Sequence, residues 1–484
     1  MGGGVNVIRR ASIDKAFWHL VDWASDGRVA DAERWVPGTR PNPALTGRDQ
    51  PTPRGGVVKI LHVIQRYWPY TGGSERHLQE ISERLVRRGH RVTVFTTDAF
   101  NLELFWNRRK ERVDTPVEAH NGVDIRRFPV RHLPGDHLAF GGIRRGMSVL
   151  SGAPFATGPL LRAMAAYAPR VPDLRRALDN LDDDYDVVHG MNVCFETLLL
   201  PALAAARRHR IPFIVTPLIH LGESERSVVR RFYTMPHQLQ LIAQADAVLA
   251  QTPIEVDYLI AHKVARDRIT LSGVGVNPSE VLGGVADRFR LATGLTTPLV
   301  VYIGTSAYDK GTVHLVEAMC RLWDRAGQPC AADLVLAGPV FDQFQTFLDR
   351  LPARHRAHVH VLGFVDEAAK RDLLDAASVV AMPSRTDSFG IVYLEGWLYR
   401  KPVIGARAGG VPAVIDDRGD GFLVDFGDVA ALAGRIAQLL AEPGLAAAMG
   451  ERGRTKVMER FTWDQIYPVV EEVYERLCRR AMVR

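Results

Sequence analysis

The 484-residue chain has few cysteines and no long hydrophobic run. Its four cysteines are far apart and include no Cys-x-x-Cys pair, so neither a zinc site nor a disulfide framework is indicated. Arg9 and Arg10 are followed by neither an apolar core nor a small-residue cleavage site, and we expect no secretory signal. No apolar run approaches the roughly 18–20 residues of a membrane span. These absences fit a reducing compartment, and we predict a cytoplasmic protein.

A strong charge excess is also missing. The formal net charge is +6 and the pI is about 9.2, which fits an anionic substrate, anionic lipid headgroups or simply an arginine-rich composition. None of the recurring nucleic-acid modules is visible, so we expect no nucleic-acid partner. The length favours two to three domains, and a hydrophobic fraction of 46% is ordinary for a globular protein.

Strand and helix patterns divide the chain into four parts. Residues 1–56 form an arm that ends in a Pro- and Gly-rich linker, and we expect this arm to contact its own body or a second subunit. Residues 57–283 repeat a strand–turn–helix pattern, and a second such series covers residues 298–460 after a break that resembles a linker. A helical tail, 461–484, follows. Two consecutive series predict an α/β fold of two doubly wound parallel-sheet domains that face each other across a cleft.

The most informative stretch runs from Pro383 to Glu395. A buried strand precedes it, and a helical apolar pattern follows its Ser-Phe-Gly turn. Such a helix start is an anion site, because its first amides are unpaired and its dipole end is positive. Asp387 falls before the helix and Glu395 about one turn inside it. This layout suits a nucleotide sugar, and the alternative is a turn whose Asp merely caps a helix.

The stretch resembles the signature of the retaining GT-B glycosyltransferases of family 4, in which two Glu flank a seven-residue gap, here with Asp387 in place of the first. The resemblance spans roughly Val58 to Trp463. It implies two Rossmann-like domains, an N-terminal one for the acceptor and a C-terminal one for the nucleotide sugar, with the final helix crossing back to the N-terminal domain. It also implies that Asp387 is catalytic and holds sugar hydroxyls, and that Glu395 holds the ribose. The neighbouring donor-binding residues would be Ser388, Phe389, Gly390, Ile391 and Val392.

Two further turns match the donor side of this family. Gly72 and Gly73 follow a strand and open a helix, which is the right context for close approach to phosphates, although a tight turn would look the same. Gly363 and Phe364 lie where the backbone of the family holds the base, and here the alternative is a plain strand-end turn.

The diphosphate loop of the family is only partly matched by residues 303–311. Lys310 stands at the position of the Lys that neutralises the diphosphate, and outside this context it would be an ordinary surface lysine. Thr305 stands where the family has Arg, which removes a planar bidentate donor, and Ser306 follows it. We predict that all three residues contact the donor.

The imidazoles expected near the reacting sugar are also altered. Relatives carry two His two residues apart at the end of a strand, whereas this chain has His189 and then Met191. His220 follows the next strand and could supply the missing imidazole. We name both His as catalytic candidates beside Asp387 and Lys310, with a hydrogen-bonded structural role as the alternative for each.

Residues 126–145 contain five Arg against a single acid, Asp136. In the family the corresponding region shapes the acceptor site, sometimes at a membrane surface, whereas most such runs are solvated faces. We therefore predict a sugar, small-molecule or lipid-linked acceptor and a peripheral contact with the inner membrane face.

Together these features predict a retaining hexosyltransferase that takes a nucleoside-diphosphate sugar and needs no metal or cofactor. The lost polar residues favour an alternative, a non-catalytic or donor-remodelled homologue that serves as a binding or partner subunit; Thr305, Met191, Asn277 and Ala413 are those positions. The retained Lys310, Asp387 and Glu395 argue against it. The base, the donor sugar and the acceptor stay open.

Overall fold

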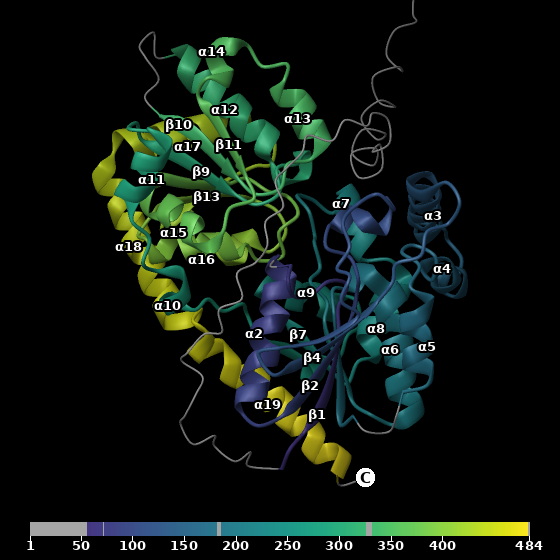
Figure 1. Ribbon diagram of the computed structural model, residues 1–484. Helices are drawn as coiled ribbons and strands as arrows, with labels where there is room; N and C mark the ends of the chain where they lie inside the picture. Colours follow the sequence, from purple (N-terminus) through teal and green to yellow (C-terminus); the bar gives the residue numbers. More distant parts are fainter. Residues whose placement is uncertain (1–55, 71, 182–184, 326–331, 483–484) are drawn as a thin grey trace, which may run out of the picture.

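The computed structural model describes residues 56–70, 72–181, 185–325 and 332–482. These residues form two α/β bodies, the first at lower right and the second at upper left in Figure 1. The expectation for the N-terminal arm falls on residues that, up to 55, lie outside this description. Within the described part, no helix is both long and apolar enough to cross a bilayer.

Eight strands form the sheet of the first domain in the part of the chain that is described. Their order is β3-β4-β2-β1-β5-β6-β7-β8, and all neighbours are parallel except the antiparallel pair β3 and β4. The strands are β1 (Lys59–Val63), β2 (Arg91–Thr97), β3 (Val117–His120), β4 (Val123–Phe128), β5 (Val187–Met191), β6 (Phe213–Thr216), β7 (Ala247–Ala250) and β8 (Ile269–Leu271).

Helices cover both faces of this sheet, because successive strand residues point to opposite sides. In β1, Leu61 and Val63 join the core closed by α5 (Pro172–Asp179) and α6 (Glu196–His209). Ile60 joins the opposite core, closed by α2 (Gly73–Arg87) and the final helix α19 (Trp463–Met482). The other helices of this domain are α3 (Asp136–Ser151), α4 (Gly158–Ala165), α7 (Val228–Tyr233), α8 (Pro236–Gln244) and α9 (Pro253–Ala261).

The second sheet is parallel throughout, and its six strands within the described residues have the order β11-β10-β9-β12-β13-β14. Two sheets, parallel apart from the β3–β4 pair of the first, with helices on their faces confirm the predicted α/β class. The strands are β9 (Leu299–Ile303), β10 (Asp333–Ala337), β11 (Val359–Gly363), β12 (Val379–Met382), β13 (Val403–Ala406) and β14 (Gly421–Val424). The helices are α10 (Pro278–Val281), α11 (Ala286–Thr293), α12 (Thr312–Arg325), α13 (Asp342–Leu348), α14 (Ala353–Arg356), α15 (Glu367–Ala376), α16 (Ile391–Leu398), α17 (Val429–Ala441) and α18 (Pro443–Arg460).

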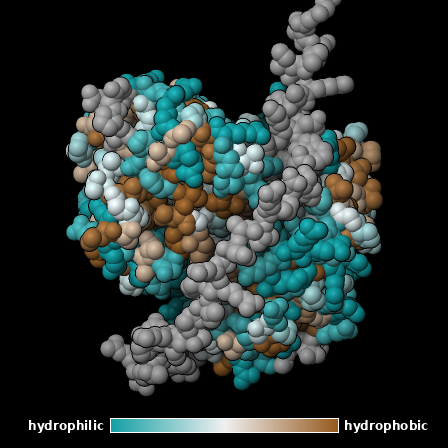
Figure 2. All heavy atoms as spheres, turned by 45° about the horizontal axis from the view of Figure 1, so that its top comes forward, coloured by the Kyte–Doolittle hydropathy of each residue, from teal (hydrophilic) through white to brown (hydrophobic). Residues whose placement is uncertain are grey.

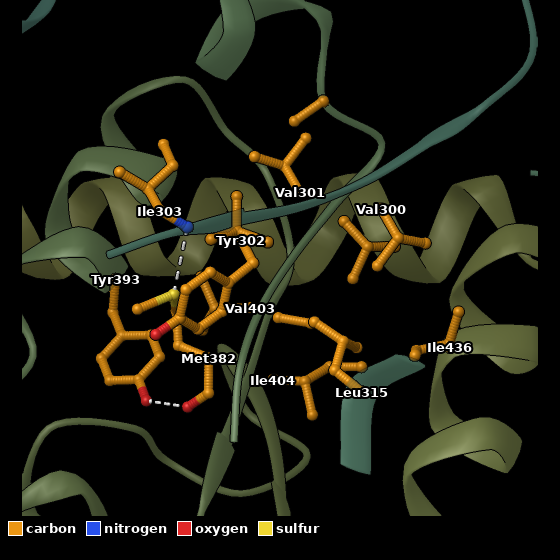
Figure 3. Packing of buried hydrophobic residues seen from close by; sticks show 14 of the residues in the cluster. Val300, Val301, Tyr302, Ile303, Leu315, Met382, Tyr393, Val403, Ile404 and Ile436 are labelled. Atoms are coloured by element: carbon orange, nitrogen blue, oxygen red, sulfur yellow. Dashed lines mark hydrogen bonds between the residues drawn. The ribbon is translucent and has the colours of Figure 1, made fainter. Parts of the chain in front are cut away.

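The core of the second domain anchors the segment that follows β12. Figure 3 shows Met382 and Tyr393 packed against β9. The amide of Ile303 donates to Met382 Sδ at 3.4 Å, and the Tyr393 hydroxyl donates to the Met382 carbonyl at 2.6 Å. The start of α16 is therefore fixed to the end of β12.

Helix α11 lies in a stretch that the sequence pattern assigns to an interdomain linker. Phe289 of this helix is buried in the second core. The amides of Val285 and Ala286 donate to Asp372 and Asp375 of α15, each at 2.8 Å. A short helix between glycine-rich ends resembles a linker in sequence, and only these long-range contacts reveal that it belongs to the second domain.

The chain crosses between the domains twice at one place. The Val276 amide donates to the Phe461 carbonyl at 2.8 Å, and the Trp463 amide donates to the Val276 carbonyl at 3.1 Å. Beyond this crossing, α19 packs on the first sheet (Figure 1). Its Tyr474 hydroxyl lies 3.0 Å from Nε2 of His62 and 2.6 Å from Nδ1 of His189, so one hydroxyl joins α19 to two central strands.

Tyr474→Phe should therefore destabilise the protein, because two buried imidazole nitrogens lose their partner at a cost of about 1–3 kcal/mol. We expect a lower midpoint of thermal unfolding, measured by calorimetry, because phenylalanine offers no hydrogen bond to replace the lost ones. Tyr167→Phe is the control, since that side chain is 50% exposed and its hydroxyl can be solvated. Equal midpoints for the two variants would contradict this role of Tyr474.

Candidate functional site

The candidate residues gather where the strand order of each sheet reverses. In the first sheet β1 lies between β2 and β5, and in the second β9 lies between β10 and β12. Ligands of doubly wound sheets bind beyond the carboxyl ends of strands at such points. Here β1 leads to Gly72 and Gly73, β9 leads to Lys310, and β12 leads to Asp387.

An ion pair between Lys310 and Asp387 forms the centre of the site. The Lys310 ammonium lies 2.6 Å from Asp387 Oδ1 and also donates to the Thr386 carbonyl at 3.2 Å. Burial alone would raise the pKa of Asp387, but the Lys310 cation holds that pKa below its ordinary value. The carboxylate is therefore ionised at neutral pH and fixed in orientation.

A glycine lets the two loops meet at this pair. Gly311 has a φ of +77°, and a Cβ at that position would lie 2.1 Å from the Pro383 carbonyl oxygen. Any other residue would push the Lys310 loop away from the segment that carries Asp387.

His220 brings the first domain to the same place. Its ring stacks on Tyr233 with centroids 4.3 Å apart, and its Nδ1 is buried without a hydrogen-bond partner among the described residues. Burial and the nearby Lys310 cation lower the pKa of His220 to about 4, while the Asp387 carboxylate opposes this shift. The imidazole is therefore neutral at physiological pH and can accept a hydrogen bond or a proton.

Glu395, the second acid of the signature, points into the second domain. It lies in α16 with its side chain 10% exposed, and its Oε1 is 3.1 Å from the Lys370 ammonium of α15. Burial alone would lower the pKa of Lys370, but Glu395 and Glu367 raise it above its ordinary value. The ammonium of Lys370 therefore fixes the position of the Glu395 carboxylate.

The turn between the two acids presents backbone amides. Gly390 precedes α16 with a φ of +92°, and a Cβ there would lie 2.3 Å from the Tyr393 ring. Phe389 is buried against Phe461, with ring centroids 5.4 Å apart, so its amide and not its ring is available to a ligand. Ile391 and Val392 supply the first amides of α16, which have no partner within the helix.

The remaining donor candidates line the ends of β9 and β11. The Thr305 carbonyl accepts from the Tyr302 hydroxyl at 2.8 Å, which fixes the start of the loop. The Ser306 hydroxyl is buried without a partner among the described residues, and its amide donates to Pro339 at 2.7 Å. Gly363 has a φ of +66°, and Phe364 after it is 65% exposed at the edge of the domain.

Gly72 and Gly73 face this region from the first domain. Gly72 is the N-cap of α2, and a Cβ added to Gly73 would lie 3.8 Å from Cδ1 of Ile391. A side chain at position 73 would therefore touch the first residue of α16.

His189 is not part of this group. Its ring is fully buried, with Nδ1 on Tyr474 and Nε2 2.8 Å from the Thr216 hydroxyl. Burial lowers the pKa of His189 well below its ordinary value. Strand alternation in β5 turns this side chain to the α19 face with Val187 and Met191, whereas the site lies beyond the strand end.

Direct contacts join the two domains around the site. The Ser388 hydroxyl donates to Gln251 Oε1 at 2.9 Å, and the Gly409 amide donates to the Gly222 carbonyl at 2.9 Å. Arg385, held by Asp309 at 2.9 Å within its own domain, reaches Glu223 of the first domain at 3.3 Å. The loops after β6 and β7 thus meet the signature directly.

Two family models match successive parts of this chain. The model described as "Glycosyl transferase 4-like domain" matches residues 72–275, and that described as "Glycosyl transferases group 1" matches residues 286–456. The chain belongs to the glycosyl transferases of group 1. The predicted family is thereby confirmed, and with it the prediction of a glycosyltransferase.

Curated relatives of this group 1 transferase include several named D-inositol 3-phosphate glycosyltransferase. That of Xylanimonas cellulosilytica is 27% identical over 470 residues, which cover 90% of this chain and 100% of the relative. That of Streptomyces avermitilis is 31% identical over 251 residues, which cover 49% of this chain and 53% of the relative.

Solved structures with the same fold include HepE of Anabaena, in complex with UDP and glucose, and the sucrose-phosphate synthase of Thermosynechococcus elongatus. The first is 18% identical with a TM-score of 0.62 and covers 87% of this chain and 100% of its own. The second is 20% identical with a TM-score of 0.65 and covers 87% and 99%. These likenesses confirm the predicted GT-B fold of the transferase.

Several residues of the transferase site escape sequence reasoning. Lys370 lies 25 residues before Glu395, in a different helix, and no spacing rule links the two. Gln251 and Glu223 come from loops of the first domain that carry no motif. Arg385 lies inside the signature itself. A cation in the same short stretch as Asp387 and Glu395 is a sequence signal that points to a site residue.

Lys310→Met should raise the pKa of His220, because it removes a cation that disfavours the imidazolium. Nitrogen chemical shifts of selectively labelled histidine, followed from acid to neutral pH, would measure it. Lys401→Met is the control, since Lys401 is a partly buried lysine that donates to Asp375 within the second domain. An unchanged His220 pKa in the Lys310 variant would show that the two groups are not coupled.

Proposed function

We propose that this transferase moves a sugar from a nucleoside-diphosphate sugar to an acceptor hydroxyl with retention at the anomeric carbon, without a metal or cofactor. The observation that carries the proposal is the partly buried Lys310–Asp387 ion pair, with the neutral imidazole of His220 beside it from the opposite domain. A cation, an oriented carboxylate and an imidazole in one cleft suit a reaction in which charge moves onto a leaving diphosphate.

The second domain would bind the donor. An ammonium has three donors, so Lys310 can keep its contacts to Asp387 and Thr386 and give its third to a phosphate oxygen. The amides at the start of α16 would hold the same diphosphate, since a helix start favours anions. Glu395, held by Lys370, would accept from the ribose hydroxyls.

Asp387 would hold the sugar itself. Its ionised carboxylate would accept from sugar hydroxyls and favour positive charge at the anomeric carbon as the bond to phosphate breaks. In the retaining step proposed here, the acceptor attacks from the face that the phosphate leaves, and the phosphate takes the acceptor proton. No protein nucleophile is then required.

The first domain would hold the acceptor near His220 and Tyr233. A phosphorylated cyclitol is the first acceptor to test, because curated relatives are named for D-inositol 3-phosphate. Sugars, other small molecules and lipid-linked acceptors would then be tested in the same sugar-transfer assay with the purified protein.

The alternative is a non-catalytic partner subunit. Thr305 favours it, because the donor loop then lacks the Arg of the family. The two intact acid–lysine pairs, Lys310–Asp387 and Lys370–Glu395, favour catalysis, since a binding subunit has no need of both. Donor hydrolysis or transfer by the purified protein separates the two functions.

Glu395→Gln should weaken donor binding about tenfold or more, because a charged acceptor for the ribose is lost. A panel of uridine, guanosine and adenosine diphosphate sugars, scored by thermal shift, first identifies the donor, and titration calorimetry then measures its affinity. Glu367→Gln is a matched control: Glu367 pairs with the same Lys370 but is 66% exposed and lies outside the signature. Equal affinities for the two variants would refute the ribose contact.

We also propose that α3 and α4 rest on an anionic membrane surface from the cytoplasmic side. Leu138, Arg145 and Val149 are exposed and fall on one face of α3, since they are seven and four residues apart. Phe155 and Leu160, 65% and 51% exposed, continue this apolar surface to α4. Figure 2 shows hydrophobic residues at the right edge of the molecule, where Figure 1 has these helices. Apolar side chains beside arginine suit anionic headgroups.

The double variant Val149→Ser, Phe155→Ser should reduce sedimentation with phosphatidylglycerol vesicles about tenfold or more, since each apolar side chain contributes about 1.5–3 kcal/mol when buried. Phosphatidylcholine vesicles should bind the wild type weakly. Leu291→Ser is the control, because Leu291 is 85% exposed but lies on the second domain. Unchanged sedimentation of the double variant would rule out this surface.

A further inference from the structure

Glu255, a buried carboxylate of α9, connects two loops of the first domain. Its side chain is 3% exposed. Its Oε1 accepts from the amide of Ile219 at 2.9 Å, and its Oε2 accepts from the amide of Gln251 at 2.8 Å. These amides belong to the loops that follow β6 and β7, so a single side chain joins two neighbouring strand ends.

Each of these loops carries a group that meets the second domain. Ile219 immediately precedes His220, and the same loop continues to Gly222, whose carbonyl accepts from Gly409. Gln251 accepts from the Ser388 hydroxyl of the signature. The carboxylate of Glu255 therefore lies behind the contacts that bring the two halves of the site together.

We propose that Glu255 is a positioning residue whose ionised carboxylate fixes His220 and Gln251 where they meet the signature, and that protonation of this carboxylate loosens the site. An ionised carboxylate accepts with both oxygens, whereas a protonated one turns one oxygen into a donor that faces a backbone N–H. One of the two loops then loses its hydrogen bond. The inference rests on the proposed function only where activity is the readout.

The charges around the site make this protonation relevant near neutral pH. Burial raises the pKa of Glu255 to about 7, and among the described residues no cation offsets it. The titratable and charged groups at these loops are His220, whose pKa burial lowers to about 4, Glu223 with its partner Arg385, and Lys310 and Asp387 from the second domain. Asp387 has a pKa below its ordinary value despite burial, because of Lys310. Burial thus brings the pKa of Glu255 near neutrality, whereas the pKa of Asp387 is lowered.

The first test is the pH profile of Glu255→Gln. Its amide carries one acceptor oxygen, and its NH₂ group opposes the second backbone N–H at every pH. We expect the wild type to lose activity as pH drops through about 7. In the variant, we expect kcat/KM to fall about tenfold or more at pH 8 and this acid limb to disappear. An equal loss at all pH values, with the acid limb kept, would overturn the proposal in favour of a merely structural role.

Glu196→Gln is the matched control, because Glu196 is also a buried carboxylate of the first domain. Burial alone would raise its pKa, but Arg144, at 2.6 Å, and His237 hold that pKa below its ordinary value. This variant should keep the acid limb near pH 7. Loss of the limb in both variants would assign it to some other group and overturn the proposal.

Hydrogen exchange provides a readout that needs no activity. The amides of Ile219 and Gln251 should be protected in the wild type at pH 8 and exchange at least tenfold faster in Glu255→Gln, after correction for intrinsic rates. The same amides should lose protection in the wild type below pH 6. Unchanged protection in Glu255→Gln would overturn the proposal even if the protein proved to be an active transferase. Lost protection in Glu255→Gln, together with a wild type that transfers no sugar, would support the positioning role of Glu255 and refute the proposed transferase activity.

Discussion

The Lys310–Asp387 ion pair is the interaction on which the candidate site depends. The Lys310 ammonium lies 2.6 Å from the Asp387 carboxylate and holds the pKa of that carboxyl below its ordinary value despite burial. The pair also joins two loops that are distant in sequence, one after β9 and one after β12. Burial lowers the pKa of His220, the group that the first domain contributes, and the Lys310 cation adds to this shift while the Asp387 carboxylate opposes it.

The topology explains why such distant residues meet. Parallel strands all end at one edge of their sheet, and the reversal of strand order at β1 and at β9 leaves a gap between the loops of each domain. The two gaps face each other because the chain crosses twice at Val276 and Thr462, and because α19 returns to cover the first sheet. The hydrogen bond from Ser388 to Gln251 is one direct contact that results from this arrangement.

The sequence predicted what local patterns determine. Apolar runs predicted the strands, and the turn before α16 predicted an anion site, because the residues involved are close in the chain. Long-range contacts could not be predicted from local patterns. Lys370 pairs with Glu395, α11 joins the second core, and Glu255 accepts a hydrogen bond from the loop that carries His220. His189 shows a different limit, since a motif gives a position in the chain, whereas strand alternation decides which way the side chain points.

The effect of Thr305 on the donor site depends on the charges around it. Lys310 is paired with Asp387, and Arg385 lies between Asp309 and Glu223, so these side chains carry more negative than positive formal charge. An arginine at position 305 would have offset that balance, and threonine does not. A diphosphate entering here would rely on the amides of α16 and on the third donor of Lys310 to a greater degree than in a loop with two cations. Contact of Arg385 with a phosphate would require it to leave Glu223, which would couple donor binding to the contact between the domains.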